Sequence, residues 1–365
     1  SAFAAGLLAA PPIAPTAPAG APKIVVEHTN INPNKAAHVG HLRNAVLGDL
    51  LGRSLRALGH PVEIQNYIDD TGVQLADVVV GFLDLEPTSL AEIRALPEPF
   101  DYHCWDLYAR VGRWYEEDPA RLERRRETLH ALEAGTGERA QAARLIARRI
   151  VGRHLGTMAR LGIGYDLLTR ESDILGRHFF DHAFQQLRER GAVRLEADGK
   201  NAGCWVMPLA DVAEFAGLED PDKVIVRSDG TITYVGKDIA YQLWKFGLLG
   251  KEFAYRYWME QGVWETAAEG AENPPAFGHA GRVINVIDAR QSYLQRIVRA
   301  GLEALGHPEA AANSVHFAYE MVSLSAATAR QLGQAVGEEE GRSVEMSGRK
   351  GIGVKADDLL DRLVE

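Results

Sequence analysis

The chain has 365 residues, of which 46% are apolar, and a formal net charge of −10. This length allows one large or two moderate domains around a sizeable core. The acidic balance excludes a protein that coats nucleic acid with a basic surface, although not one with a local basic groove. Cys104 and Cys204 lack metal-ligand spacing, so neither a disulfide framework nor a zinc site is predicted, and we expect a reducing, cytoplasmic compartment. No apolar run is long enough for a membrane span.

The two ends of the chain differ from the rest. Residues 1–22 are rich in Ala and Pro. The run AFAAGLLAA lacks the basic residues and the initiating Met of a secretory signal, so we interpret residues 1–22 as a linker. At the other end, residues 356–365 have a helical pattern that is still continuing at Glu365. Both ends are therefore expected to be cuts.

A strand, a polar loop and a helix open the folded part. Residues 24–26 are β-branched and apolar, residues 29–34 are polar with one Pro, and apolar residues then recur at helical spacing from Leu42 to Leu58. The motif HVGH, residues 38–41, is therefore placed on the turn that begins the helix. Unpaired N–H groups and the helix dipole make such a turn a site for a phosphate.

A second strand, 62–68, and a helix from Val73 to about Leu83 follow. This βαβ order predicts a parallel sheet with ligands at the carboxyl ends of its strands. Asp69 and Asp70 lie between strand and helix. We interpret them as helix caps rather than metal ligands, since Asp is a preferred cap and no third ligand is evident.

The middle of the chain has a different pattern. Residues 84–165 are helical and charged, and arginines alternate with an apolar stripe from Leu145 to Leu161. Residues 166–227 predict an α+β segment with a helix near Phe180. Its short strands are expected around Val193 and at 204–207 and 224–226.

The sheet is expected to resume after the turn at Asp229 and Gly230. The predicted elements are strands at 231–235, 283–287 and 315–322, helices at 238–246 and from 288 to about 305, and a loop at 264–275. Near the end, residues 344–354 (VEMSGRKGIGV) form a basic, Gly-rich loop of the kind that closes over a polyphosphate.

The HVGH and VEMSGRKGIGV segments resemble the HIGH and KMSKS signatures of class I aminoacyl-tRNA synthetases. The similarity to arginyl-tRNA synthetases extends from about Lys23 to the C-terminus, in the order and spacing of EHTNINPNKAAHVGHLRN, TYVGKDIAY, DARQSYLQ, VSLSAATARQLG and MSGRKGIGVKADDLLD. The resemblance implies an α/β, Rossmann-type parallel-sheet nucleotide-binding fold interrupted by an α+β connective insertion. The implied division is a linker at 1–22, catalytic halves at 23–83 and 228–340, an insertion at 84–227, and a KMSKS-like loop with the start of a truncated helical region at 341–365.

The resemblance implies activation of L-arginine by ATP with Mg²⁺, followed by transfer of arginine to tRNA(Arg), in a monomer without a membrane segment or structural metal. The nucleophile is an ionised carboxylate, so the site must position reactants and neutralise phosphate charge rather than supply a strong base. By this resemblance ATP is contacted by His38, Gly40, His41, Met346, Ser347 and Arg349.

The KMSKS match is incomplete, because Glu345 and Gly348 stand at the two lysine positions. Family members without the second lysine have one just upstream of HIGH, and Lys35 is at that place. The catalytic set implied is therefore Lys35, His38, His41 and Lys350.

The family's arginine pocket matches Glu27, Asn32, Tyr234, Asp238 and Gln291. Glu27 and Asp238 would bind the guanidinium, which asks for carboxylates and a flat ring such as that of Tyr234. Asn32 and Gln291 would orient the α-amino and carboxylate groups.

Two other functions stay open at this point. One is a non-catalytic paralogue or fragment that binds tRNA, arginine or a protein partner, since the N-terminal and anticodon-binding domains of the family have no counterpart in the sequence. The other is an aminoacyl-adenylate ligase that needs no tRNA. The arginines at 144, 148, 149, 153 and 160, or those at 124–126, are either contacts for tRNA phosphates or a solvated helix face.

Overall fold

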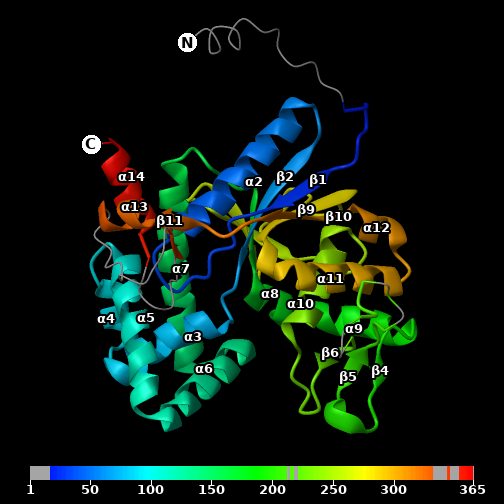
Figure 1. The fold of residues 1–365 in the computed structure, drawn as a ribbon, viewed down its shortest axis with the longest axis horizontal. Coiled ribbons are helices and arrows are strands. Elements are labelled where there is room, and N and C mark those ends of the chain that lie inside the picture. The colour runs from blue at the N-terminus through cyan, green and yellow to red at the C-terminus, as the bar shows by residue number, and fades with distance from the viewer. Residues whose placement is uncertain are drawn as a thin grey trace, which may run out of the picture.

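A seven-stranded sheet runs through the computed structural model, which describes residues 17–364 except 211, 213, 218–220, 332–342 and 346–352. All neighbouring strands are parallel except β8 and β7, which are antiparallel. The strand order is β10 (Ser314–Tyr319), β9 (Arg282–Asp288), β1 (Ile24–Glu27), β2 (Val62–Ile68), β3 (Leu167–Arg170), β8 (Val263–Ala267) and β7 (Ala254–Trp258). Figure 1 shows helices on both faces of this sheet.

Alternation along β1 explains the layers. Ile24 and Val26 pack with apolar residues of α2 (Val39–Ala57), whereas Val25 points to the opposite face and packs near Phe246. Successive side chains of a strand point to opposite faces, so a short run without polar residues fits a central strand that is covered on both sides. The second face is covered by α10 (Tyr234–Lys245) and α11 (Ser292–Ala304) (Figure 1).

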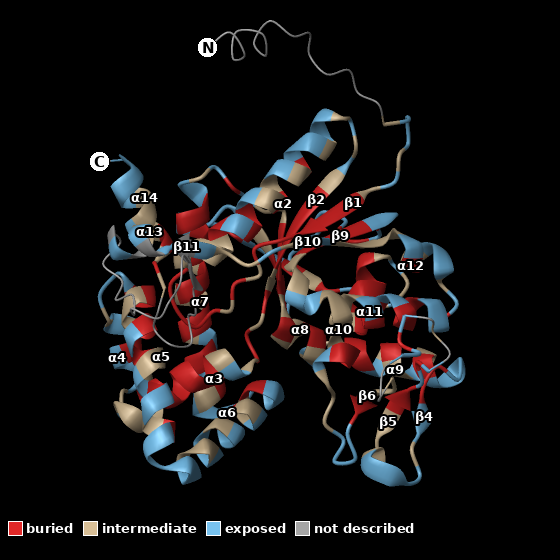
Figure 2. Ribbon diagram, in the orientation of Figure 1, coloured by how far each residue is buried: buried red, intermediate tan, exposed pale blue. Residues whose placement is uncertain are grey.

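A helical module follows β2 and has its own apolar core. Figure 2 colours much of the ribbon of this module as buried, and its buried apolar side chains form one cluster. Its elements are α3 (Val73–Val80), a π-helical turn η1 (Gly81–Leu85), α4 (Leu90–Ala95), α5 (Phe100–Glu117), a 3₁₀ turn η2 (Pro119–Arg121), α6 (Leu122–Ala134) and α7 (Gly137–Ala159). The helical prediction for this part of the chain is confirmed.

A smaller α+β module follows β3. It contains a three-stranded antiparallel sheet in the order β4, β5 and β6, packed with α9 and α10 against a common core. Its elements are α8 (Glu171–Gly176), α9 (Phe179–Glu189), β4 (Arg194–Leu195), a 3₁₀ turn η3 (Gly199–Asn201), β5 (Trp205–Met207) and β6 (Lys223–Val226). The helix near Phe180 and the short strands are as predicted.

The last helix of the chain lies beside the start of α2. The remaining elements are a 3₁₀ turn η4 (Ala289–Gln291), α12 (Pro308–Asn313), β11 (Ser323–Ser325), α13 (Ala326–Gln331), β12 (Ser343–Glu345) and α14 (Ala356–Val364). β11 and β12 pair antiparallel, and α14 packs on α2 (Figure 1). Among the described residues, no helix has the length and apolar character needed to cross a membrane.

Three predicted elements are wrong. Residues 231–235 are not a strand, because α10 already begins at Tyr234 and only Ile232 forms an isolated bridge, with Val226. The predicted loop at 264–275 contains most of β8, whose inner residues are buried. Residues 166–227 do not lie wholly outside the main sheet, because β3 is a buried strand within it. In each case packing against distant segments outweighs the local pattern.

One buried carboxylate on β8 forms hydrogen bonds with residues of β3, β7 and α7. Glu265 on β8 is fully buried and accepts hydrogen bonds from Arg148 on α7 at 3.0 Å, Arg170 on β3 at 2.8 Å and Arg256 on β7 at 2.6 Å. Burial opposes ionisation, but Arg170 and then Arg256 hold the pKa of Glu265 below its usual value. The carboxylate is therefore ionised in the folded protein.

We expect Glu265→Gln to lower the free energy of unfolding by about 3 kcal/mol, because it removes the charge that three arginines face. Urea unfolding measures this loss. The control is Glu269→Gln, at an exposed position just after the end of β8, which should change stability by less than about 0.5 kcal/mol. Equal stability of the two variants would show that the arginines are satisfied by solvent.

Candidate active site

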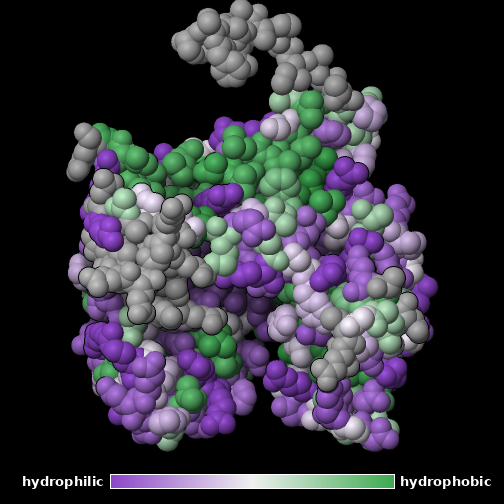
Figure 3. Space-filling view, in the orientation of Figure 1, coloured by the Kyte–Doolittle hydropathy of each residue, from purple (hydrophilic) through white to green (hydrophobic). Residues whose placement is uncertain are grey.

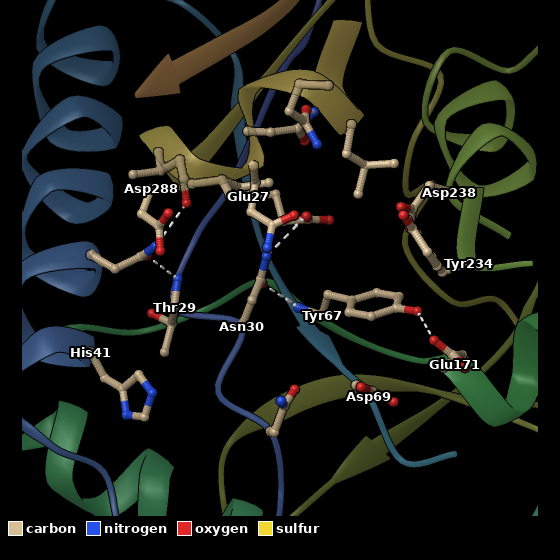
Figure 4. Close-up of a pocket in the computed structure, with 18 of the residues that line it drawn as sticks. Glu27, Thr29, Asn30, His41, Tyr67, Asp69, Glu171, Tyr234, Asp238 and Asp288 are labelled. Carbon is tan, nitrogen blue, oxygen red and sulfur yellow. Dashed lines mark hydrogen bonds between the residues drawn. The ribbon is translucent and has the colours of Figure 1, made fainter. Parts of the chain in front are cut away.

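A pocket of about 890 Å³ lies at the carboxyl ends of β1, β2 and β9, where parallel sheets bind their ligands. Figure 3 shows hydrophilic surface around the hollow between the helical module and the α+β module, and Figure 4 shows the lining side chains. The predicted site residues that line the pocket are Glu27, Asn32, Lys35, His38, His41, Tyr234, Asp238 and Gln291.

The two signature histidines cap α2 through their own side chains. His38 is the N-cap residue, and its Nδ1 accepts a hydrogen bond from the N–H of Gly40 at 3.1 Å. Nδ1 of His41 accepts from the N–H of His38 at 3.2 Å, and the two rings stack with centroids 3.6 Å apart. Because each Nδ1 is an acceptor, each neutral ring carries its proton on Nε2. Both histidines therefore present an N–H donor beyond the cap.

Burial is the main reason that these rings are neutral. It lowers the pKa of His38 to about 4, assisted by the charge of Lys35. The pKa of His41 lies well below its usual value for the same reason, with His38 and His154 adding to the effect. Gly40 contributes space, because a Cβ there would lie 3.0 Å from the His38 ring.

Lys35 lies under the pocket between aromatic rings. Its side chain is only 6% exposed, and Nζ is 4.7 Å from the centre of the Trp105 ring and 5.0 Å from that of Tyr108. The carbonyl of Lys35 accepts a hydrogen bond from the ring of His154 on α7 at 2.7 Å. These contacts from α5 and α7 hold the lysine beside the two histidines.

The loop between β1 and α2 is conformationally strained. Thr29 and Asn30 have φ angles of +75° and +45°, which are costly for residues other than Gly. The N–H of Thr29 donates to Asn44 at 2.5 Å, and the N–H of Asn30 donates to Asn66 at 3.0 Å. Buried amides of α2 and β2 thus stabilise a backbone that the loop would not adopt alone.

The residues after the second signature lie against the first. The N–H of Val39 donates to the carbonyl of Val354 at 3.2 Å, and the N–H of Ala356 donates to the carbonyl of Ala37 at 2.8 Å. Lys355 forms an isolated bridge with His38. The predicted ATP contacts Met346, Ser347 and Arg349 and the predicted catalytic Lys350 lie outside the described residues.

One face of α10 forms a wall of the pocket. Tyr234 is 58% exposed at its first turn. Burial, and then the charges of Glu171 and Glu27, raise the pKa of Asp238 to about 8. The pocket-lining residues of α10 recur at helical spacing, so they share one face: Tyr234, Asp238, Tyr241, Gln242 and Lys245.

Glu27 is placed in the pocket with a cationic partner that the sequence did not suggest. Its carboxylate lies 2.7 Å from Nζ of Lys245, which is 2% exposed. Asn30 also donates to Glu27 at 3.0 Å, and Lys245 donates to Asn285 of β9 at 3.1 Å. Part of the hydrogen-bonding capacity of Glu27 is thus already used.

Sequence reasoning missed a second acidic wall. Asp69 follows β2, Glu171 follows β3, and Tyr67 donates to Glu171 at 2.5 Å. The interpretation of the two aspartates as helix caps is wrong, since Gly72 is the N-cap of α3 without a side-chain cap, and Asp70 instead accepts hydrogen bonds from Ser172. The signal in the sequence that could have revealed this wall is the apolar run of Leu167 and Leu168 before Glu171, because an acidic residue that directly follows a buried parallel strand lies at the ligand-binding edge of the sheet.

The arginine-rich helices are largely neutralised within the chain. Arg149 pairs with Glu98 at 2.7 Å, Arg153 with Asp101 at 3.3 Å and Arg160 with Asp357 at 2.6 Å. Arg125 pairs with Asp77 at 2.7 Å. Such guanidinium groups hold elements together, so the described structure favours a structural role over contacts with tRNA phosphates.

The sequence matches a family model over residues 14–248, described as tRNA synthetases class I (R), catalytic domain. The chain belongs to this family. It is 39% identical over 355 residues to an arginine–tRNA ligase of Thermococcus sibiricus, covering 94% of the chain and 52% of that protein. It is 40% identical over 354 residues to one of Deinococcus radiodurans, covering 93% and 51%.

The fold is also similar to a solved structure, the arginyl-tRNA synthetase of Thermus thermophilus. The TM-score is 0.76 at 36% identity, over 99% of this chain and 55% of the other. The chain thus spans about half the length of the curated relatives it matches. The class I catalytic fold expected from the signatures is confirmed. Within the described residues, no group of three or more His, Cys, Asp or Glu side chains is placed to hold a metal ion.

We expect His38 and His41 to remain neutral, with the proton on Nε2, from pH 5.5 to pH 8, because burial disfavours the charged rings. Nitrogen-15 NMR of histidine-labelled protein distinguishes the tautomers and follows titration. His38→Asn and His41→Asn assign the signals. Titration of either signature ring near pH 6.5 would contradict the capping geometry.

Proposed function

We propose that this chain is the catalytic part of an arginine–tRNA ligase, which activates L-arginine with ATP and transfers it to the 3′ end of tRNA(Arg). The observation that carries the proposal is the shared pocket, in which the signature residues of the first motif meet acidic residues from α10 and the sheet. The division into two catalytic halves, 23–83 and 228–340, with an insertion at 84–227 between them is part of this proposal.

In the proposed reaction the carboxylate of arginine attacks the α-phosphate of ATP, a P–O bond to arginine forms, and the bond to pyrophosphate breaks. The Nε2–H groups of His38 and His41 donate to phosphate oxygens, and Lys35 neutralises charge that builds up on the transferring group. Gly40 leaves room for the adenosine. Mg²⁺ is proposed to enter with ATP and neutralise further phosphate charge. Neither histidine has to act as a base.

The amino acid is proposed to lie along α10. The guanidinium meets Asp238, Tyr234 packs along it, and Glu27, shared with Lys245, contributes from the end of β1. Asn32 and Gln291 orient the α-amino and carboxylate groups from the opposite wall. This arrangement satisfies a planar cation better than the point charge of a lysine.

Arginine-dependent exchange of pyrophosphate into ATP tests the function. We expect exchange with arginine but not with lysine, and only when tRNA is present, since the family resemblance implies that requirement. The assay is run on this chain and on a version extended at both ends. Silence from both versions, with intact binding of arginine and ATP, would favour a non-catalytic binding protein. Product formation with an amine acceptor in place of tRNA would favour the tRNA-independent ligase.

Asp238→Asn is expected to weaken arginine binding by about tenfold to a hundredfold, because it replaces a buried charge-assisted hydrogen bond with a neutral one. ATP binding should change by less than about twofold, and titration calorimetry measures both ligands. The exposed Asp229→Asn, before the same helix, is the matched control. Equal losses for arginine and ATP would contradict the assignment.

A further inference from the structure

Three carboxylates surround the hydroxyl end of Tyr67 in the pocket (Figure 4). Asp69 comes from the end of β2, Glu171 from the start of α8 and Asp238 from α10. After burial, their charges are the causes that raise the pKa of Tyr67 well above its usual value. Elements far apart in the sequence therefore concentrate negative charge at one end of the pocket.

The pocket carboxylates differ in whether they have a cationic partner. Glu27 pairs with Lys245 at 2.7 Å, and Glu171 pairs with Lys237 at 2.8 Å. Asp288, elsewhere on the pocket wall, pairs with Arg290 at 2.8 Å. By contrast, among the residues that the structure describes, no Lys, Arg or His nitrogen lies within 4.0 Å of the carboxylate of Asp69 or Asp238. Asp69 and Asp238 are thus the pocket carboxylates that no cationic side chain of the described residues already occupies.

Asp69 is also held in a defined place. Its carboxylate accepts a hydrogen bond from the backbone of Thr71, while its buried Oδ1 has no hydrogen-bond partner among the described residues. A Cβ at Gly72 would lie 2.4 Å from Oδ1 and 2.3 Å from Oδ2. The glycine at the start of α3 therefore leaves room for this carboxylate, and the unpartnered oxygen remains available to a donor.

We propose that Asp69 is a specificity-determining residue, which together with Asp238 accepts hydrogen bonds from the guanidinium of the bound amino acid. The proposal rests on the proposed function and adds an acidic contact to it. A guanidinium has five N–H donors on separate edges of one plane, so carboxylates on two walls of a pocket can bind it together. A neutral side chain of the same shape would leave both carboxylates without a partner.

Binding of a guanidinium between Asp69 and Asp238 is coupled to the protonation of both carboxylates. In the pocket without ligand, burial and then the charge of Glu171 raise the pKa of Asp69 to about 7 and that of Asp238 to about 8. Asp70 adds to the shift of Asp69 and Glu27 to that of Asp238, whereas Lys237 opposes both shifts and Lys245 opposes that of Asp238. A bound guanidinium favours the ionised carboxylates and lowers both pKa values, so binding near pH 7 releases protons. Arginine affinity should therefore rise as the pH increases from 6 to 9 and fall as protons compete at lower pH.

Titration calorimetry of the chain with L-arginine and with citrulline, its neutral analogue, tests the proposal. Asp69→Asn keeps the shape of the side chain and an acceptor for Thr71, but it should weaken arginine binding by about tenfold or more. Citrulline binding and ATP binding should stay within about twofold. The number of protons released with arginine at pH 7, measured in buffers of different ionisation enthalpy, should fall because one titrating carboxylate is gone.

Two further variants separate position from charge. Gly72→Ala retains Asp69 but forces its carboxylate to move, and it should also reduce arginine affinity. Asp173→Asn removes a charge from the same helix as Glu171, outside the pocket, where its carboxylate accepts from Thr266 at 2.7 Å. This control should leave arginine affinity and proton release unchanged. Thermal unfolding of each variant shows that the fold is retained.

The outcomes are distinct. Unchanged arginine affinity and proton release in Asp69→Asn, with a loss in Asp238→Asn, would overturn the role of Asp69 and leave the proposed function intact. An equal loss of arginine and citrulline binding in Asp69→Asn would also overturn it, because the residue would then shape the pocket rather than read charge. Failure of the unsubstituted chain to bind arginine would overturn the proposed function, and the role of Asp69 with it.

Discussion

The ion pair between Glu27 and Lys245 joins β1, an inner strand of the sheet, to the helix that forms one wall of the pocket. Both partners are buried, at a distance of 2.7 Å, and Lys245 also binds Asn285 on β9. Breaking such a pair leaves an unpaired charge in a low-dielectric interior, which is strongly unfavourable. The ion pair therefore fixes the rotation of α10 about its axis. The residues at helical spacing from Lys245 then face the pocket, and that face carries Asp238 and Tyr234.

The other side of the pocket depends on backbone geometry rather than on ion pairs. His38 and His41 satisfy donors at the start of α2, and the paired segment after residue 352 lies against them. Capping, which normally serves only helix stability, here also fixes which ring nitrogen carries the proton. The strained backbone at Thr29 is held by Asn44, which also donates to Val286 on β9 at 2.7 Å. The helix, the loop and two strands are therefore positioned together.

The sequence was most informative where local pattern and tertiary context agree. The strand at 62–68 and the helix that begins after His38 were predicted closely, because their apolar periodicity and stop signals are local. The prediction of a strand at 231–235 was wrong, since Thr231, Thr233 and Val235 favour strands when considered alone. β8 was predicted as a loop because a charged residue, Glu265, stands at its centre, and the arginines that bind this carboxylate are on three other elements.

The same limit applies to the site. The family resemblance implied roles for Lys35, His38, Asp238 and Glu27, and all four line one pocket in the structure. It did not suggest Lys245 or Glu171, because their meaning comes from partners on other strands and helices. The arginines of α7 were open to two interpretations, and only the positions of carboxylates such as Glu98 and Asp357 distinguish them.

The pocket has opposite electrical character at its two ends, and this polarity orients the proposed substrates. Lys35 and the two Nε2–H donors lie together at the start of α2, whereas Asp69, Glu171 and Asp238 lie around Tyr67 (Figure 4). A polyphosphate is attracted to the first end and a guanidinium to the second, so each would be repelled from the other's place. An amino acid with its cationic side chain among the carboxylates must direct its own carboxylate towards the histidines. The charge pattern that selects arginine in the proposed reaction therefore also aims its nucleophile at the α-phosphate.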